Sequence, residues 1–600
     1  NPTLPMSSTS ARTADSVRWD LSDLYASPTD PAIRSDQDLL RTDATQFSAT
    51  YKGRLSTLTA PQMAVMLTEY ERMSDTLGKL GSYAYLLWST NTEDPAHGKL
   101  LQQITEFSSE ISQILVFFDV ETLAVPDATF ERWLKAKELK PWHFFLESSR
   151  RFQPHILSEA EEQILTQKSV TGAQAWIRYF DETLGAARFE LDGEQLPEQD
   201  VLSKLHESDR ELRQRAAASL TTGFAQMQRT LTFVFNTLLA DKQINDRLRK
   251  YPSWITSRNL SNMISDQTVD TLIDSVRGFY PVVQRYYRLK ASILKMDTLM
   301  DYDRYAPIIK NESKVEWEEA RRMVIDSYSG FHPEMGRITA EFFDKNWIDA
   351  AVVPGKRGGA YSASTVPSAH PYVFMNYDGR LRDVQTLAHE LGHGVHQYLS
   401  REQGVLQADT PLTTAETASV FGEMLVFQNL LASLSDPKEK LALLMSKIDD
   451  TIATVFRQVS MNRFEHAMHT ARREEGELTT ERLSELWIKT QSDLYGDSVT
   501  LSEGYATWWC YIPHFLHTPG YVYAYAFGEL LVLALYEEFN RHPDGFADKY
   551  MDLLRAGGSD WPEELIRKVG VDIAHPDFWN NGLRIFERMV NEAEELARHV

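Results

Sequence analysis

Apolar side chains recur at three- and four-residue spacing along most of this chain of 600 residues. That spacing places them on one face of an α-helix, so the pattern predicts a mainly helical fold. Asp-Pro at 94–95, Pro-Asp at 126–127 and Asp-Pro at 436–437 interrupt the pattern, and such pairs mark turns between helices. The predicted helices cover residues 55–122, 130–145, 158–183, 198–245, 268–295, 314–344, 381–401, 411–433, 437–475, 480–494, 521–541 and 578–599.

Two segments depart from the helical period. Residues 188–197 (RFELDGEQLP) alternate around Asp192-Gly193, which predicts a small β-hairpin. Residues 355–377 open with the glycine-rich GKRGGAYSAS and continue into the compact HPYVFMNY, which predicts a strand at 371–377. A small amount of β-structure is therefore expected within a helical chain.

The length of the chain exceeds what one compact core usually carries, so we expect more than one domain. The change of pattern near residues 185–200 predicts the boundary between them. We expect a flexible N-terminus at 1–16, a helical N-terminal domain at 17–195 and a larger domain at 196–600 that holds the motifs described next.

Composition and charge restrict the classes of function. The formal net charge of −23 repels nucleic acid and anionic membranes, so we expect neither as a partner. The sequence contains no apolar run of about 18 residues, so it predicts no membrane span. The polar N-terminal residues lack the apolar stretch of a secretory signal. The single cysteine, Cys510, cannot form an internal disulfide, which together with the missing signal favours the cytoplasm. A metal site in this chain would need His and carboxylate ligands.

Residues 387–396 read LAHELGHGVH and contain His389-Glu390-x-x-His393, which fits the zinc-peptidase pattern. On a helix, positions i and i+4 lie about 40° apart and one turn along, so both imidazoles can bind one ion. Glu390 lies about 100° round the helix from His389. It can flank the metal without binding it, within reach of a water molecule. The alternative is an ordinary helix with two partly exposed histidines.

The surroundings of the motif favour a packed helix. Asp383 is the predicted N-cap. Gly392 and Gly394 each cost the helix about 1 kcal/mol relative to Ala, which indicates a close approach of another group or of a neighbouring helix. A single apolar stripe is formed by Leu387, Leu391, Val395 and Tyr398.

A catalytic zinc site needs a third protein ligand. Thr410-Pro411 predicts a helix start, with a capping hydroxyl and Pro at the first position. Glu416 would then lie inside this second helix, 23 residues after His393, which leaves room for a loop and an antiparallel return. We predict Glu416 as the third ligand. The alternative is a capping box in which Glu416 serves Thr413.

Three further groups are candidates for lesser roles. Glu423 follows Glu416 by seven residues and shares its helix face, so we predict that it holds a ligand histidine from behind, with an ordinary buried ion pair as the alternative. His396 could compete as a ligand, but a structural role is favoured. Glu465-His466 and His469 are interpreted as a helix surface feature.

Five motifs in sequence order make the chain resemble the oligoendopeptidase F branch of the thimet oligopeptidase family. The resemblance spans nearly the whole chain. It implies a mainly α, two-lobed metallopeptidase with a deep substrate channel, a small β element near the active site, one zinc ion per chain and oligopeptide substrates. The motifs are RWDLSDLY at 18–25, GKRGGAYS at 355–362, HELGHGVHQ at 389–397, AETASVFGE at 415–423 and PHFLHTPGYVYAYAFG at 513–528.

The last of these motifs supplies candidates for stabilising an oxyanion. By resemblance we favour His514 and Tyr521, with Tyr525 next, and plain aromatic packing is the alternative. The family more often carries tyrosines around 516–519, where this chain has Leu516-His517-Thr518. The outer substrate contacts of this chain therefore differ from the family pattern.

The mechanism expected from these residues is hydrolysis by a metal-activated water, with Glu390 as the general base that later protonates the leaving amine. Gly358, Gly359 and Ala360 are predicted to bind substrate with the strand at 371–377, by offering a backbone edge to an extended peptide. An ordinary turn and packed strand is the alternative.

The expected function is a zinc-dependent endopeptidase that cuts short oligopeptides. One rival is a zinc carboxypeptidase or dipeptidyl carboxypeptidase on a similar scaffold. That rival needs a cationic group for the substrate C-terminus, and the sequence does not locate one. The second rival is a peptide-binding protein that has lost catalysis, but Glu390 and the three predicted ligands are all present.

Overall fold

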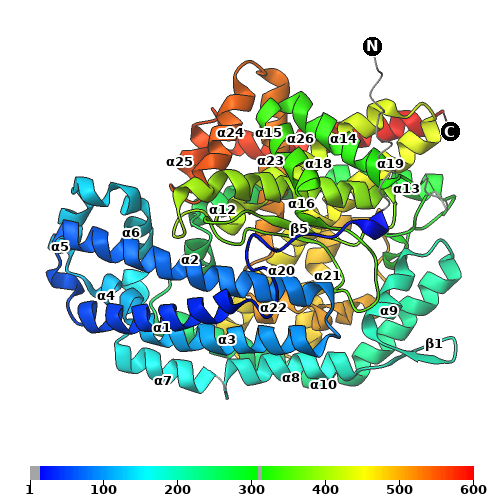
Figure 1. Ribbon diagram of the computed structural model, residues 1–600. Coiled ribbons are helices and arrows are strands. Elements are labelled where there is room, and N and C mark those ends of the chain that lie inside the picture. Colours follow the sequence, from blue (N-terminus) through cyan, green and yellow to red (C-terminus); the bar gives the residue numbers. More distant parts are fainter. Residues whose placement is uncertain (1–13, 170, 309–313, 600) are drawn as a thin grey trace, which may run out of the picture.

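The computed structural model describes residues 14–169, 171–308 and 314–599 and confirms the mainly helical fold (Figure 1). The helices up to residue 293 are α1 Pro31–Tyr51, α2 Ala60–Thr90, α3 Pro95–Leu115, α4 Phe117–Ala124, α5 Asp127–Leu134, α6 His143–Ser149, α7 Glu159–Ser169, α8 Ala173–Ala186, α9 Glu198–Ser203, α10 Arg210–Leu248, α11 Thr256–Ser261, α12 Asp266–Gly278 and α13 Tyr280–Ile293. The later helices are α14 Trp317–Phe331, α15 Pro333–Asp344, α16 Leu381–Ser400, α17 Leu412–Ala415, α18 Thr417–Ser433, α19 Pro437–Thr451, α20 Arg457–Glu475, α21 Thr480–Tyr495, α22 His514–His517, α23 Tyr523–Arg541, α24 Phe546–Ala556, α25 Pro562–Arg567 and α26 Pro576–Ala597.

Proline-containing pairs begin helices where the sequence predicts breaks. Asp94 caps α3, its carboxylate accepting the N–H of Ala96 at 2.8 Å, and Asp436 caps α19 in the same way. The predicted helix at 437–475 is divided, because a π-helix, η8 (Ile452–Phe456), lies between α19 and α20. Such π segments occur frequently at functional sites.

The β-structure is small, as the sequence predicts. β1 (Phe189–Leu191) and β2 (Glu194–Leu196) form the hairpin, and Asp192 and Gly193 adopt positive φ at its turn. The second sheet has the order β3-β5-β4, with β3 Ile348–Asp349, β4 Tyr361–Ala363 and β5 Tyr372–Phe374. β5 is parallel to β3 and antiparallel to β4, so β4 is an edge strand.

A buried ion pair fixes the glycine-rich segment to this sheet. Lys356 Nζ lies 2.5 Å from Asp349 Oδ1 and donates to the carbonyl oxygens of Ala351 and Met375 at 2.8 and 2.7 Å. Both charged side chains are buried. The chain therefore enters β4 from a defined position.

Two hydrophobic cores hold the molecule together. One joins residues of α1–α6 with residues of α12–α19 and α23–α26. The other joins α8–α10 with α20–α22 and the segment 505–512. Neither core is confined to one side of residue 195, and the domain boundary remains a prediction. Residues 1–13 of the predicted flexible N-terminus lie outside the described residues.

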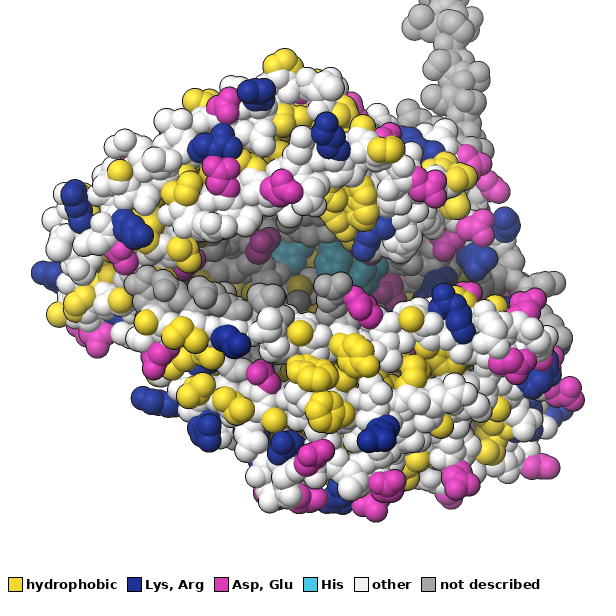
Figure 2. Space-filling view, turned by 90° about the horizontal axis from the view of Figure 1, so that it is seen from below, with side chains coloured by type: hydrophobic (Ala, Val, Ile, Leu, Met, Phe, Trp, Pro, Cys, Tyr) yellow, Lys and Arg dark blue, Asp and Glu magenta, His cyan; other side chains and the backbone are white. Residues whose placement is uncertain are grey.

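The helices surround a cleft. In Figure 1, α1–α6 lie to the lower left, α7, α8 and α10 along the bottom, and α14–α16 with α23–α26 above. Figure 2 views the molecule from below and shows a deep hollow with histidine side chains at its floor. Within the described ranges, no helix has the length and apolar character that crossing a bilayer requires.

Candidate active site

Helix α16 presents the two histidines of the motif to the cleft. Leu387, Leu391 and Val395 are fully buried and pack the opposite stripe of the helix. The rings of His389 and His393 lie 4.9 Å apart at an angle of 81°. The i,i+4 spacing therefore brings two imidazoles to the same place, as the sequence predicts.

The predicted N-cap of this helix is wrong. α16 begins at Leu381 with Arg380 as the N-cap, and Asp383 lies within the first turn. Its Oδ2 accepts the backbone N–H groups of Asp378 and Arg380 at 2.9 and 3.0 Å. A carboxylate in the first turn can satisfy unpaired amides as well as one at the cap.

Gly392 explains how a second helix reaches the histidines. A Cβ atom on Gly392 would lie 2.6 Å from Ser419 Cα, so a side chain there would collide with the backbone of α18. Of the two readings of the glycines, the neighbouring helix is the correct one for Gly392. That helix follows directly on Glu416.

Glu416 does not lie inside a continuous helix, contrary to the prediction. Pro411 is the N-cap of the short α17, and Glu416, with φ −82° and ψ 0°, separates α17 from α18. Helix α23 packs against this break, since a Cβ on Gly528 would lie 3.1 Å from Glu416 Cβ. The Thr413 hydroxyl donates to the carbonyl of Asn262 at 3.0 Å, so the alternative of a capping box between Thr413 and Glu416 is not the arrangement found.

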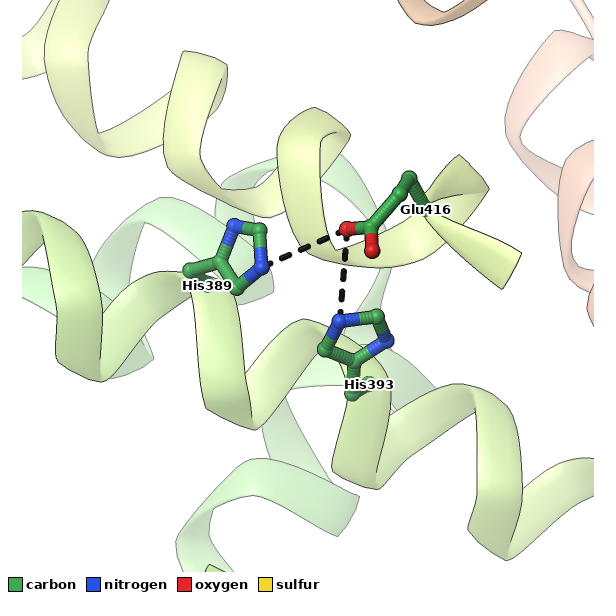
Figure 3. A group of neighbouring side chains, drawn as sticks. All are labelled: His389, His393 and Glu416. Carbon is green, nitrogen blue, oxygen red and sulfur yellow. Dashed lines mark ion pairs between the residues drawn. The ribbon is translucent and has the colours of Figure 1, made fainter. Parts of the chain in front are cut away.

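The three predicted ligands converge (Figure 3). Glu416 Oε2 lies 3.3 Å from Nε2 of His389 and 3.3 Å from Nε2 of His393. All three ligand atoms lie within 4.8 Å of one another. In the described part of the chain, these three residues form the group of metal-binding side chains that could hold an ion. Two imidazoles and a carboxylate suit zinc, with a fourth position left for water. Ser419 Oγ donates to the same Glu416 oxygen at 2.6 Å and orients it.

The electrostatics of this group favour a cation. Burial raises the pKa of Glu416, but His389 and His393 more than offset it, so that the pKa lies well below its usual range. Burial lowers the pKa of His389, but pairing with Glu416 and Glu423 raises it to about 10. Glu416 and Glu423 therefore both face His389 and favour a positive charge at this place.

Glu423 lies behind His389, in the position predicted for it. Its Oε2 is 3.3 Å from His389 Nδ1, and its Oε1 is 2.8 Å from Nζ of the buried Lys447. Lys447 Nζ also lies 3.7 Å from Oε1 of the buried Glu529 in α23. Helices α16, α18, α19 and α23 are thus connected behind the metal-binding group.

Glu390 is buried at the wall of a cavity of about 460 Å³ that is also lined by His393, Ala360, Tyr361 and Ser362. The pKa of Glu390 lies above its usual value, because the effect of burial exceeds the lowering by the neighbouring histidines and by the backbone of Ser362. A carboxylate in this place can exchange a proton with a group held in the cavity.

The predicted substrate segment reaches the cavity only in part. Ala360 lines it, whereas Gly358 and Gly359 do not belong to its lining. Gly359 adopts φ +82°, and its carbonyl accepts from Asn376 at 3.1 Å, so it turns the chain into the edge strand β4. Ser362 of that strand binds Gln397 of α16, with 2.7 Å between Oγ and Oε1.

His514, Tyr521 and Tyr525 form one aromatic cluster. Tyr525 Oη lies 3.4 Å from His514 Nε2, and the rings of Tyr521 and Tyr525 are 5.1 Å apart. Tyr525 precedes Gly528 by three residues in α23, and it is Gly528 that packs against Glu416. The three residues do not belong to the lining of the cavity beside Glu390. Burial and, to a smaller extent, the charge of Glu416 raise the pKa of Tyr525 to about 12.

Two histidine interpretations have different outcomes. His396 is buried, burial lowers its pKa to about 3, and it lies outside the ligand group, which agrees with a structural role. Glu465 and His469 are buried, so their interpretation as a surface feature is wrong. Trp254 stacks on His469 at 4.6 Å, and Glu465 accepts the N–H of Gly520 at 2.8 Å.

Sequence reasoning missed Lys447. A signal was present, because Lys447 lies in α19 on the same stripe as the buried Leu444 and Ile448. A lysine on an apolar stripe is rarely buried unless it is paired. Its partners come from two other helices, and their approach is not encoded in the local pattern.

A helical scaffold that presents a His-Glu-x-x-His helix and a carboxylate from a second helix defines a metallopeptidase. The profile of Peptidase family M3 matches residues 203–585, and the profile of Oligopeptidase F matches residues 121–189. The chain belongs to peptidase family M3. It is therefore a metallopeptidase whose substrates are oligopeptides.

Individual relatives can be aligned with nearly the whole chain. Oligopeptidase PepF of Bacillus subtilis (strain 168) is 28% identical over 591 residues, covering 97% of this chain and 87% of that protein. Group B oligopeptidase PepB of Streptococcus agalactiae is 28% identical, with 99% of each chain covered. A solved structure from Chlamydophila abortus matches with a TM-score of 0.86 at 25% identity, covering 98% of this chain and 100% of that one. Oligoendopeptidase-F from Enterococcus faecium matches in fold with a TM-score of 0.71 at 24% identity, covering 94% and 99%.

Proposed function

We propose that this chain is a zinc-dependent endopeptidase that hydrolyses internal bonds of short oligopeptides. His389, His393 and Glu416 hold one zinc ion, and Glu390 is the general base. The observation that carries the proposal is the convergence of the three ligand atoms within 4.8 Å, next to a cavity lined by the buried Glu390. Bound zinc would supply a water of lowered pKa and polarise the scissile carbonyl.

The protein residues have separate tasks in this mechanism. Glu390 accepts the proton of the attacking water and passes it to the leaving amine. Tyr525, with His514 and Tyr521, donates hydrogen bonds to the carbonyl oxygen as it becomes negative. Glu423 orients His389 through its Nδ1. The contacts described above support these roles.

The peptide is proposed to bind along β4. In β5, the backbone N–H of Val373 donates to the carbonyl of Trp347, the residue before β3, at 2.9 Å. The backbone groups of the adjacent Tyr372 and Phe374 therefore face β4. Ser362, opposite Val373, turns its backbone groups away from β5, to the outer edge of β4, beside Ala360 and the cavity. Its carbonyl accepts from Gln397 at 3.4 Å and its N–H is directed to Glu390, so a bound peptide would replace these two contacts. An extended substrate can pair with that edge through its backbone, while Gly358 and Gly359 leave space before the strand.

The expected compartment is the cytoplasm, supported by a single cysteine that is buried and unpaired. Nucleic acid and membranes are not expected as partners, because the chain carries a net charge of −23.

The deciding experiment replaces Glu390 by Gln and uses an internally quenched peptide of about ten residues, blocked at both ends, a length suited to extended binding. We expect cleavage to fall by about three orders of magnitude or more, while zinc stays near one per chain. The matched control is Glu402→Gln, which changes an exposed carboxylate just beyond the same helix.

Other outcomes point to the rivals. Cleavage of the peptide only when its C-terminus is free would indicate a carboxypeptidase or dipeptidyl carboxypeptidase. Binding of zinc and peptide without cleavage by the wild type would indicate a peptide-binding protein. Unchanged cleavage by Glu390→Gln would refute the assigned base.

A further inference from the structure

Two arginines, Arg304 and Arg457, are not paired with any carboxylate in the described part of the chain. Arg304 is buried and donates to the hydroxyls of Tyr495 and Tyr505, the latter at 3.2 Å. Arg457, the first residue of α20, donates to the Tyr305 hydroxyl, and its Nε is buried without a partner. Within the described ranges, neither guanidinium forms an ion pair with Asp or Glu. The charge of Asp449 also acts on Tyr305 and His206, but its carboxylate is already paired with Lys290 at 2.7 Å.

Tyr305 lies at the centre of this cluster. Its ring centre is 5.3 Å from Arg304 Cζ and 5.6 Å from Arg457 Cζ, and the ring of His206 stacks on it at 4.7 Å. Such contacts offset only a small part of the cost of burying a cation. The neighbouring Arg213, in contrast, lies 2.9 Å from the carboxylate of Asp303. A guanidinium that is not paired with a carboxylate of its own chain is suited to binding one from outside the chain.

Arg382 links this cluster to the metal-binding group. It lies in α16 seven residues before His389, hence on the same helix face and about 10 Å along the axis. Its side chain is exposed. Burial lowers the pKa of His206, and the charges of Arg382 and Arg457 lower it further, so these side chains share one region. Figure 2 shows Lys and Arg side chains beside the histidines of the cleft.

We propose that Arg382 and Arg457, together with His206 and Tyr305, bind a carboxylate of the peptide substrate. The inference rests on the proposed peptidase function and adds a specificity site to it. An extended peptide advances about 3.3 Å per residue, so the carboxylate lies about three to five residues from the cleaved bond. It comes from the C-terminus of a short substrate or from an acidic side chain. The π-helix η8, directly before Arg457, sets the direction of that side chain.

The test compares three internally quenched peptides of one sequence on the full-length zinc-loaded enzyme, with four residues after the cleaved bond. The first ends in Gln with a free carboxylate, the second in Gln amide and the third in Glu amide. We expect KM of the wild type to be about tenfold lower for the first peptide than for the second. In Arg457→Gln and in Arg382→Gln this ratio should fall toward one.

The control is Arg463→Gln in the same helix, whose guanidinium binds Asn462 at 2.6 Å. It should keep the wild-type ratio. A low KM for the third peptide as well shows that acidic side chains also bind, whereas a low KM for the first alone shows that the chain end binds. If Arg457→Gln fails to fold, the exposed Arg382→Gln carries the comparison.

Two results would overturn the proposal: equal KM values for all three peptides on the wild type, or a wild-type ratio in both arginine variants. Failure of the proposed function has a different signature. In that case the wild type cleaves none of the three peptides, and the carboxylate site falls with it.

Discussion

The metal-binding group is rich in carboxylates, whereas the arginine cluster is rich in guanidinium groups. In the first, carboxylates surround two imidazoles. Among the described residues, Lys447 is the one lysine or arginine that forms an ion pair with these carboxylates. In the second, Arg304 and Arg457 lie against the ring of Tyr305, and neither forms an ion pair with a carboxylate among the described residues. The carboxylates of the first group are Glu390, Glu416 and Glu423.

Uncompensated charge inside a protein is costly, so each region is suited to an ion that the chain does not supply. The metal-binding group fits a cation taken from solution. The arginine cluster fits an anion that arrives with the substrate. A peptide extended between them would be cleaved at one end and recognised at the other.

The largest effect on this comparison is expected from Tyr525→Phe, which removes a donor from the reacting end. Its hydroxyl is proposed to stabilise the oxyanion, so kcat should fall by about 10²–10³ with little change in KM. Steady-state kinetics on a zinc-saturated sample measure this. Tyr536→Phe in the same helix should behave as wild type. A kcat of Tyr525→Phe within about threefold of wild type would exclude the role.

Lys447→Met should have the next largest effect, because it removes the cation that anchors Glu423. Glu423 would then lose its orientation toward His389, and zinc affinity should fall by about 10–100-fold. Competition with a coloured zinc chelator gives the dissociation constant. Lys447→Arg keeps the charge and should regain part of the affinity. A folded Lys447→Met with wild-type affinity would contradict the anchoring role.

Gly392→Ala tests whether the metal-binding end depends on close helix contact. The new Cβ would meet the α18 backbone at 2.6 Å, and the forced separation should cost about 1–3 kcal/mol of unfolding free energy and weaken zinc binding. Gly81→Ala in α2 meets nothing within 4 Å, so it should be neutral or stabilising. Urea unfolding compares the two. Equal stability of both variants would argue against a close-contact requirement.

The smallest effect is expected at Glu465, which lies in neither charged region. Burial raises its pKa to about 8, so the folded protein holds a proton that the unfolded chain releases. The stabilisation is present below about pH 4.5 and is lost as pH rises through about 8. Glu465→Gln should flatten this loss in urea unfolding measured across that window. Glu474→Gln, exposed in the same helix, should keep the wild-type slope.

Several features of the fold could be predicted because their causes are local. The Asp94 carboxylate caps a helix by accepting the N–H of Ala96, two residues further on, and Asp192-Gly193 forms a hairpin turn through its own positive φ angles. The break at Glu416 could not be predicted, because it packs against α23, more than 100 residues further along the chain. The burial of Glu465 and His469 likewise depends on Trp254 and Gly520.

The sequence by itself determined the helical class, the family and the ligand spacing of His389 and His393, because helical periodicity and an i,i+4 motif are read within a few residues. Only the tertiary structure decided how Glu416 meets both imidazoles, which cation supports Glu423 and where arginines remain unpaired. These depend on the packing of distant helices, and the energies of burial and charge pairing act across space without regard to separation along the chain.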